Sequence, residues 1–416
     1  MKITAKYMIR TYVTLTLLST FASSFIWGIN TLFLLNAGLS ITQAFAANAF
    51  FTVGQVIFEI PTGVVADTVG RRASYLLGSA TLFFSTLFYL YLWQIHGPFW
   101  LWAVSSMLLG LGFTFFSGAT DAWLVDGLKA TGYTGTLDTA FAKGQIAGGV
   151  AMLSGTAAGG IIAQFTNLGV PYIIRSVILA ISFVVTLILM KDIGFKPRRG
   201  ESVHKEMRKV LKASVDHGLR KPSVRWVMLS GPFLSGVLYY AFYAMQPYLL
   251  QLYGNSKSYA IAGLAATIVA GTQIAGGFSV PLLRKVFAKR TTVLIFTVVA
   301  GGASLAAIGL TGNFWVVLIL LAIWGALFAA SVPIRAAYLN GLIPSEQRAT
   351  VLSSDNLLGS AGAAVIQPAL AKSADMWGYG TSYVIGGAIE LFALPFLVLA
   401  RHQHAKSDPI SDKKSK

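Results

Sequence analysis

Long apolar stretches recur along the whole chain, separated by shorter polar segments. A hydrocarbon core about 30 Å thick requires about 20 mostly apolar helical residues, and twelve stretches reach this length. They are Thr11–Leu35, Gln43–Ala66, Ala73–Trp93, Phe99–Gly127, Leu137–Phe165, Val170–Met190, Trp226–Leu252, Tyr259–Leu283, Thr291–Thr311, Phe314–Gly341, Ala349–Lys372 and Tyr379–Ala400. The first is too long for the apolar part of a signal peptide, and no clear cleavage site follows it. The pattern predicts an all-α membrane protein with twelve transmembrane helices.

The composition agrees with this pattern. Of the 416 residues, 55% are hydrophobic and only 11% are charged, and the mean hydropathy is +0.67. A soluble protein usually carries about 25% charged residues, so the composition indicates a membrane protein and weighs against a soluble enzyme of two or three domains. The chain has no cysteine, which excludes disulfides, thiolate metal sites and cysteine nucleophiles.

The net charge of +17 could indicate a nucleic-acid partner, but the basic residues are sorted by membrane side. If the N-terminus is cytoplasmic, all but five of the 32 Lys and Arg fall in inner segments. The five are Lys257 and Lys372 outside, and Lys143, Arg175 and Arg335 within spans. This is the positive-inside pattern. It predicts an inner (cell) membrane protein with both termini cytoplasmic and no nucleic-acid partner.

One long hydrophilic interruption divides the chain into two halves. We expect an N-terminal six-helix bundle over residues 1–190, a cytoplasmic central loop over 191–225, a C-terminal six-helix bundle over 226–400 and a cytoplasmic tail over 401–416. Apolar residues of the loop share one face of a basic amphipathic helix that suits the inner membrane surface; these are Val203, Met207, Val210, Leu211 and Val215. A plain linker helix is the alternative.

The two halves align with each other at a shift of 214 residues. The shift places Asp121 on Arg335 and Gly63 on Gly277, together with their neighbours. Two six-span halves of similar build indicate a transporter with its substrate site between them near mid-membrane.

The loop between spans two and three carries a specific motif, Gly63-x-x-x-Asp67-x-x-Gly70-Arg71-Arg72. It resembles the loop 2–3 signature of the major facilitator superfamily, with every position kept. The resemblance implies the fold of two pseudo-symmetric six-helix bundles, alternating access, and a role for this motif in conformational switching.

Two acids lie near this loop. Glu59 precedes it by one turn and Asp126 ends span four. Both are candidate partners for Arg71 or Arg72 in the switch network, and a purely structural ion pair is the alternative.

Span five contains Gly155-Thr156-Ala-Ala-Gly159-Gly160. This segment is similar to the exporter signature of the superfamily, Gly-Pro-x-x-Gly-Gly, with Thr156 in place of proline. The partial match favours efflux by a drug:proton antiporter. Close packing of membrane helices through small residues is the alternative.

Four charged residues lie at matching depths inside the spans: Asp121, Lys143, Arg335 and Asp355. Such residues are expensive in a bilayer and are functional candidates. One hypothesis pairs them across the halves as an inner gate, Asp121 with Arg335 and Lys143 with Asp355. The other pairs them within each half, Asp121 with Lys143 and Arg335 with Asp355.

Asp121 is the first candidate for a protonatable coupling group, because an acid that loses its basic partner in a low-dielectric cleft can take up a proton. Glu390, midway along span twelve, is the second. All five histidines fall in loops or tails, which excludes a histidine relay.

The superfamily fold implies which spans line the cavity, and their aromatic and amide residues suit an amphipathic organic molecule. The candidate wall residues are Trp27, Asn30, Phe113, Phe116, Gln145, Tyr239, Tyr240, Tyr243, Gln246, Gln273, Trp324 and Gln367.

No phosphate-binding loop and no cluster with metal-ligand spacing occurs, so we expect no enzyme, no cofactor and no metal. The sequence therefore predicts a secondary active transporter, a monomer in the lipid bilayer, that exports amphipathic small molecules or drugs in antiport with protons. A proton-coupled importer, or a dedicated exporter of a metabolite, siderophore or peptide, is the alternative. A channel or scramblase is an alternative from another class of protein. It would dissipate a gradient, whereas a coupled carrier uses the proton gradient to concentrate its substrate.

Overall fold

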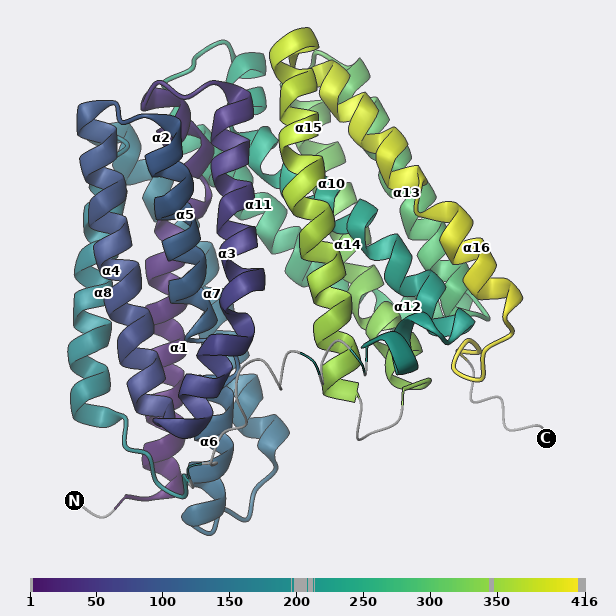
Figure 1. Cartoon of the computed structure of the whole chain (residues 1–416). Coiled ribbons are helices and arrows are strands. Elements are labelled where there is room, and N and C mark those ends of the chain that lie inside the picture. Colours follow the sequence, from purple (N-terminus) through teal and green to yellow (C-terminus); the bar gives the residue numbers. More distant parts are fainter. Residues whose placement is uncertain are drawn as a thin grey trace. The chain divides into compact units, whose positions relative to one another are not determined.

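The computed structural model describes residues 3–195, 197, 208, 212, 214–343 and 348–410, and they are helical almost throughout (Figure 1). In the first half the helices are α1 (Ala5–Trp27), α2 (Asn30–Asn36), α3 (Ile41–Thr68), α4 (Arg71–Ile95), α5 (Phe99–Thr114), α6 (Ala119–Ala130), α7 (Leu137–Phe165) and α8 (Val170–Leu189). In the second half they are η1 (Ser214–Leu219), α10 (Pro222–Tyr253), α11 (Tyr259–Phe278), α12 (Val280–Val286), α13 (Arg290–Leu310), α14 (Phe314–Asn340), α15 (Arg348–Leu391) and α16 (Leu394–His402). An isolated bridge joins Lys289 to Pro409.

The chain divides into two compact units. The N-terminal unit contains residues 1–39, 50–206 and 257–267, and the C-terminal unit contains residues 40–49, 207–256 and 268–416. The start of α3 is therefore grouped with the C-terminal unit, and the start of α11 with the N-terminal unit.

Ten helical segments of the described residues are long and apolar enough to span a membrane, or eleven if the bent pair α1 and α2 is one span. One segment, residues 351–402, contains two of the twelve predicted stretches. The all-α fold class with many spans is thus confirmed, and the helices cover all twelve predicted stretches.

Glycines break two of the predicted spans. α1 and α2 meet at an angle of 49° beside Gly28, and α5 and α6 are separated at Gly118, which has a φ of 66°. Gly378 lies between the last two predicted spans and has a φ of 82° inside α15. Residues other than glycine rarely adopt the angles of Gly118 and Gly378. At Gly378 the chain reverses direction, so that two spans follow one another (Figure 1).

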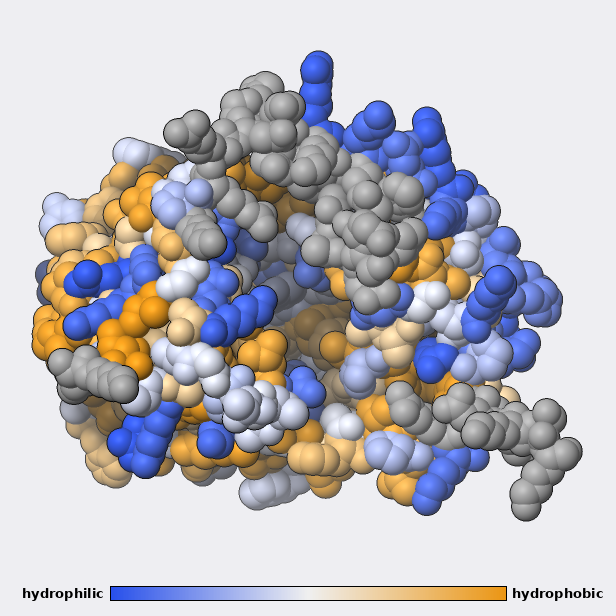
Figure 2. All heavy atoms as spheres, turned by 90° about the horizontal axis from the view of Figure 1, so that it is seen from below, coloured by the Kyte–Doolittle hydropathy of each residue, from blue (hydrophilic) through white to orange (hydrophobic). Residues whose placement is uncertain are grey.

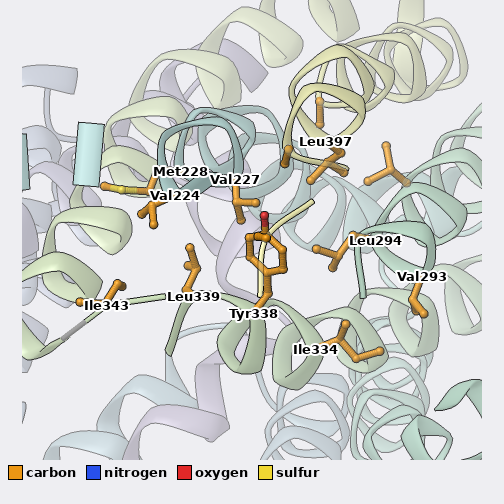
Figure 3. Close-up of a cluster of buried hydrophobic side chains, with 14 of the residues drawn as sticks. Val224, Val227, Met228, Val293, Leu294, Ile334, Tyr338, Leu339, Ile343 and Leu397 are labelled. Carbon is orange, nitrogen blue, oxygen red and sulfur yellow. The ribbon is translucent and has the colours of Figure 1, made fainter. Parts of the chain in front are cut away.

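Each unit has an apolar core at the end where its basic loops lie. In the N-terminal unit, Met8, Tyr12 and Leu15 of α1 pack against Tyr75 of α4 and Trp123 of α6. In the C-terminal unit, α10, α13, α14 and α16 contribute the larger cluster of Figure 3, which includes Val224, Val227, Met228, Leu294, Tyr338 and Leu397. Hydrophilic and hydrophobic residues are interspersed over the described surface seen in Figure 2.

Candidate functional site

The motif loop joins α3 to α4 in the N-terminal unit. Arg71 forms a salt bridge with Asp67 at 2.5 Å, one helical turn earlier. Gly70 precedes α4 with a φ of 129°, an angle that glycine tolerates best. The charges of Asp67 and Arg71 therefore neutralise each other where α3 meets α4.

Arg72 is held by the segment that follows α8. Its backbone N–H donates to both carboxylate oxygens of Asp192, at 3.0 and 3.2 Å. Its guanidinium donates to the carbonyl of Leu187 at 2.6 Å. Asp192 thus supplies an acceptor to the free N–H groups at the start of α4. Burial raises the pKa of the Asp192 carboxyl, and the hydrogen bond and charges of Arg72 oppose this shift.

The two acids that we expected beside Arg71 and Arg72 have other neighbours. Glu59 accepts a hydrogen bond from the Ser117 hydroxyl at 2.8 Å. Asp126 lies in α6, where its carbonyl faces Gly194; a Cβ on that glycine would be 2.7 Å from the carbonyl oxygen. Among the described residues, Asp67 is the ion-pair partner of Arg71.

The membrane charges of the N-terminal unit do not form an ion pair with each other within its described part. Asp121 accepts a hydrogen bond from the Tyr12 hydroxyl at 3.0 Å, and Lys143 is exposed on α7. Tyr12 is a partner that the sequence did not indicate.

The membrane charges of the C-terminal unit pair directly, as the within-half hypothesis has it. Both terminal nitrogens of Arg335 on α14 donate to the two carboxylate oxygens of Asp355 on α15. One of them also donates to the carbonyl of Val227 on α10 at 3.0 Å. The Asp355 side chain is 4% exposed and the Arg335 side chain 21%. Bidentate pairs of this kind are the strong ones, so this contact ties three helices together.

Glu390 is buried in the same unit at 7% exposure. Its Oε2 accepts a hydrogen bond from the Trp324 indole N–H at 3.3 Å. The backbone of Gly301 on α13 approaches its other oxygen, Oε1, so closely that a Cβ there would lie 2.6 Å away. The absence of a side chain at Gly301 thus creates the space for the carboxyl group.

Arg175 on α8 is a further buried charge, to which sequence reasoning assigned no role. It is 2% exposed, and its Nε–H donates to the Thr86 hydroxyl at 3.1 Å. Its guanidinium lies 6.0 Å from the centre of the Phe113 ring. Among the described residues of its unit, no carboxylate pairs with it.

The predicted cavity residues differ in burial. Asn30, Tyr240, Gln246, Trp324 and Gln367 are buried. A second group is partly buried, and Gln145 is exposed; the partly buried residues are Trp27, Phe113, Phe116, Tyr239, Tyr243 and Gln273.

One buried member, Gln367, is 0% exposed, and both polar atoms of its side chain are without a hydrogen-bond partner among the described residues. The buried hydroxyl of Tyr240 has Ser382 as a neighbour. Phe45 at the start of α3 packs against Tyr240 and Tyr243, with ring centres 5.2 and 6.4 Å apart. Buried polar atoms usually have partners, so the side chain of Gln367 is suited to hydrogen bonding with a ligand.

The small-residue segment of α7 packs tightly against α1. A Cβ on Gly159 would lie 1.9 Å from the Phe25 carbonyl oxygen, and one on Gly155 would lie 2.0 Å from the Ser24 hydroxyl. The Ser24 hydroxyl also donates to the carbonyl of Ala151 at 3.0 Å. This is the close packing that the second interpretation of the segment expects.

Most of the predicted amphipathic loop helix, Val203, Met207, Val210 and Leu211, lies outside the described residues. Within the described part of the chain, no group of three or more His, Asp or Glu is placed to hold a metal.

The comparisons with known proteins point to one family. The sequence model of the Major Facilitator Superfamily matches residues 12–366 and, in a second match, residues 258–416. No curated protein matches significantly.

Solved transporters share the fold. The nucleoside transporter NupG is 11% identical, with a TM-score of 0.78, over 94% of this chain and 98% of that one. A POT family transporter solved with a thioalcohol-conjugated peptide is 14% identical, with a TM-score of 0.72, over 96% of both chains. A D-xylose–proton symporter is 15% identical, with a TM-score of 0.68, over 94% of this chain and 96% of that one.

Proposed function

This chain belongs to the Major Facilitator Superfamily and is a multi-pass membrane transporter of small molecules rather than an enzyme, and we propose that it couples the export of amphipathic organic molecules to proton uptake. It works as a monomer by alternating access in the cell membrane.

The burial of Glu390, which is 7% exposed, is the observation that best supports proton coupling. Among the described residues, its hydrogen-bond partner is the neutral indole of Trp324, and no basic group forms a salt bridge with it. A buried carboxyl without a cation is most stable when it is protonated. It can therefore bind a proton from one side of the membrane and release it when its surroundings change.

Buried groups of the C-terminal unit support the substrate class. Gln367 supplies polar atoms without a partner among the described residues, and Phe45 supplies aromatic surface beside Tyr240 and Tyr243. Ligand sites combine mostly apolar walls with a few such polar groups. A molecule with an apolar body and one or two polar groups matches this combination.

The distribution of basic residues supports cytoplasmic termini. Lys6 lies in the first turn of α1, and Arg71 and Arg72 lie in the first turn of α4. In the C-terminal unit, Lys289 precedes α13 and Arg401 lies in the last turn of α16. The positive-inside rule assigns such ends to the cytoplasm.

The switching step rests on charge pairs near these ends. Arg71 with Asp67 fastens the motif loop, and Arg335 with Asp355 fastens α14 to α15. We propose that breaking and re-forming such pairs accompanies the change between the two access states.

The experiment has two stages. Thermal stabilisation of the purified protein across a chemically diverse library identifies a ligand, since a molecule that binds the native state raises its melting temperature. Transport of that ligand into inside-out proteoliposomes is then measured with and without an imposed pH gradient. Gradient-driven accumulation is expected in the wild type and in Asp216→Asn, a surface control, and is expected to be lost in Glu390→Gln. Gradient-independent equilibration in the wild type would contradict the proposal.

Import is the second candidate. The structural neighbours include a nucleoside transporter, a POT family transporter in complex with a thioalcohol-conjugated peptide, and a D-xylose–proton symporter. In the same vesicles, accumulation that requires protons to move in the same direction as the ligand would assign symport instead of antiport.

A further inference from the structure

The segment that follows α16 is docked on two other helices of its unit. α16 ends at His402, and residues 403–410, here called the C-terminal strap, form hydrogen bonds with the start of α13 and the end of α14. Ala405 of the strap is buried in the apolar cluster of Figure 3, and Ile410 packs against that cluster. The sequence, which predicted a tail over residues 401–416, did not indicate this docking.

The strap caps the start of α13. Lys289, the residue before the helix, does not cap it with its own side chain. The carboxylate of Asp408 takes this role, because it accepts from the backbone N–H of Thr291 at 2.9 Å and from the Thr291 hydroxyl at 3.0 Å. The first N–H groups of a helix lack partners within it, and the helix dipole favours a negative charge there. Asp408 is 2% exposed, so the cap is shielded from water.

Backbone hydrogen bonds extend this contact. The N–H of Arg290 donates to the carbonyl of Asp408 at 2.8 Å, and the N–H of Ile410 donates to the carbonyl of Ala288 at 2.9 Å. These two bonds flank the isolated antiparallel bridge between the strap and the residue before α13. The strap and the start of α13 thus share a short ladder in addition to the cap.

The strap also holds the end of α14. The Ser407 hydroxyl donates to the carbonyl of Tyr338 at 2.8 Å, which satisfies one of the last carbonyls of that helix. Gly341 follows α14 so close to the strap that a Cβ there would lie 2.6 Å from the Cβ of Ser407. The guanidinium of Arg290, the first residue of α13, donates to the carbonyl of Ser407. One residue of the strap therefore contacts both helices.

We propose that the C-terminal strap is a mechanical coupler, which makes the start of α13, the end of α14 and the end of α16 move as one block. Arg335, which pairs with Asp355, lies on α14 close to the end that the strap holds. A displacement of this end of α14 is therefore passed to α13 and α16. The coupler serves any substrate and any coupling ion, so it goes beyond the proposed function and does not depend on it.

Hydrogen–deuterium exchange of the purified full-length protein measures the coupling. Asp408→Ala removes the acceptor that caps α13. We expect amide exchange about tenfold faster in the first turn of α13, the change that matches the loss of a strong helix cap. If the strap is a coupler, exchange in the last turn of α14 should rise with it. Faster exchange in α13 alone would assign a local cap and overturn the proposal.

Asp375→Ala is the matched control. Asp375 accepts from the backbone N–H and the hydroxyl of Thr42, near the start of α3, as Asp408 does at α13. The control removes the same kind of contact from another helix of the C-terminal unit. Exchange in α13 and α14 should stay at its wild-type rate. Equal effects of Asp375→Ala and Asp408→Ala on these turns would contradict a specific role of the strap.

An engineered disulfide can restore the coupling, since the chain has no cysteine of its own. Lys289→Cys and Pro409→Cys replace the two bridged residues. Their Cα atoms form an antiparallel pair without mutual hydrogen bonds, for which a separation of about 4.5 Å is typical and within disulfide range. In the Asp408→Ala background, oxidation should slow exchange in both turns and reduction should reverse this. The single-cysteine variants are the controls. An oxidised protein whose α14 end still exchanges fast would refute the coupler.

A second pair of variants tests the strap with the Asp408 cap left in place. Gly341→Ala sets a methyl group against Ser407 and should speed exchange at the end of α14 and at the start of α13. Gly312 lies between the opposite ends of these helices with nothing within 4 Å of an added Cβ, so Gly312→Ala should change neither. Wild-type exchange at both sites in Gly341→Ala would overturn the proposal, even if Asp408→Ala does not fold.

Discussion

Removing one partner of the Arg335–Asp355 pair should destabilise the protein strongly. The Asp355 side chain is 4% exposed and the Arg335 side chain 21%, so the pair is largely desolvated. Breaking a buried pair typically costs about 3–5 kcal/mol, because the remaining charge is left uncompensated. Since Arg335 keeps some exposure, we expect Asp355→Leu to cost about 3 kcal/mol, the lower end of that range. This equals about a hundredfold change in the folding equilibrium.

The double variant separates a charge effect from a packing effect. Arg335→Met combined with Asp355→Leu leaves no buried charge, and apolar replacement of a buried pair is often neutral or stabilising. We expect its unfolding free energy to lie within about 1 kcal/mol of the wild type. Transport should nevertheless be lost, since the double variant has no pair to break.

The assay is reversible unfolding in mixed detergent micelles with increasing dodecyl sulfate, followed by tryptophan fluorescence. Asp216→Leu is the surface control. It removes an exposed pair with Arg220, and such pairs contribute about 0.3–0.5 kcal/mol. The reasoning would be refuted if Asp355→Leu lowers the unfolding free energy no more than Asp216→Leu does. It would also be refuted if the double variant loses as much unfolding free energy as Asp355→Leu and Arg335→Met lose together when each is measured alone.

Three further predictions follow from packing and charge. Gly159→Ala, whose new methyl would lie 1.9 Å from a carbonyl oxygen of α1, should cost about 1–3 kcal/mol. Gly148→Ala, on the same helix but with 3.7 Å of clearance, should cost far less in the same unfolding assay. Because burial raises the pKa of Asp192 in the folded state, stability should fall as pH rises from about 4 through the raised value, and Asp192→Asn should remove this slope. Arg175→Met removes a buried cation that has no described carboxylate partner, so its unfolding free energy should stay equal or rise by up to about 2 kcal/mol; a loss of that size would contradict this.

The helices were predictable because each span must bury its own backbone hydrogen bonds in lipid, which requires long apolar runs. The breaks within spans were not. Gly28 and Gly118 lie inside predicted apolar stretches, and only the structure shows that the helices are interrupted there. The reversal at Gly378 falls between two predicted stretches, as the sequence indicated.

The site was partly predictable. The motif of Asp67, Arg71 and Arg72 was recognised in the sequence, but the pairing of Arg71 with Asp67 was not predicted, since Glu59 and Asp126 were the expected partners. Asp67 lies on α3 and Arg71 on α4, and the turn between these helices brings the two charges together. Arg335 and Asp355 were predicted as charges at equal depth, but depth and sign alone fit partners in either half. Asp192 meets Arg72 across 120 residues, a contact that no local pattern encodes.

The segment after α8 has a mechanical consequence. Lys191 accepts a hydrogen bond from Trp123, Asp192 accepts from Arg72, and Phe195 lies 5.7 Å from the guanidinium of Arg71. At the other side of the central loop, Gly218 of η1 packs against Met228.

The described residues that precede the central loop contact the N-terminal unit, and those that follow it contact the C-terminal unit. A polypeptide cut between residues 196 and 213 would leave both sets of contacts with their own bundles. If the two halves are encoded separately, divided there and produced together, each half should keep the contacts that hold its own end of the central loop.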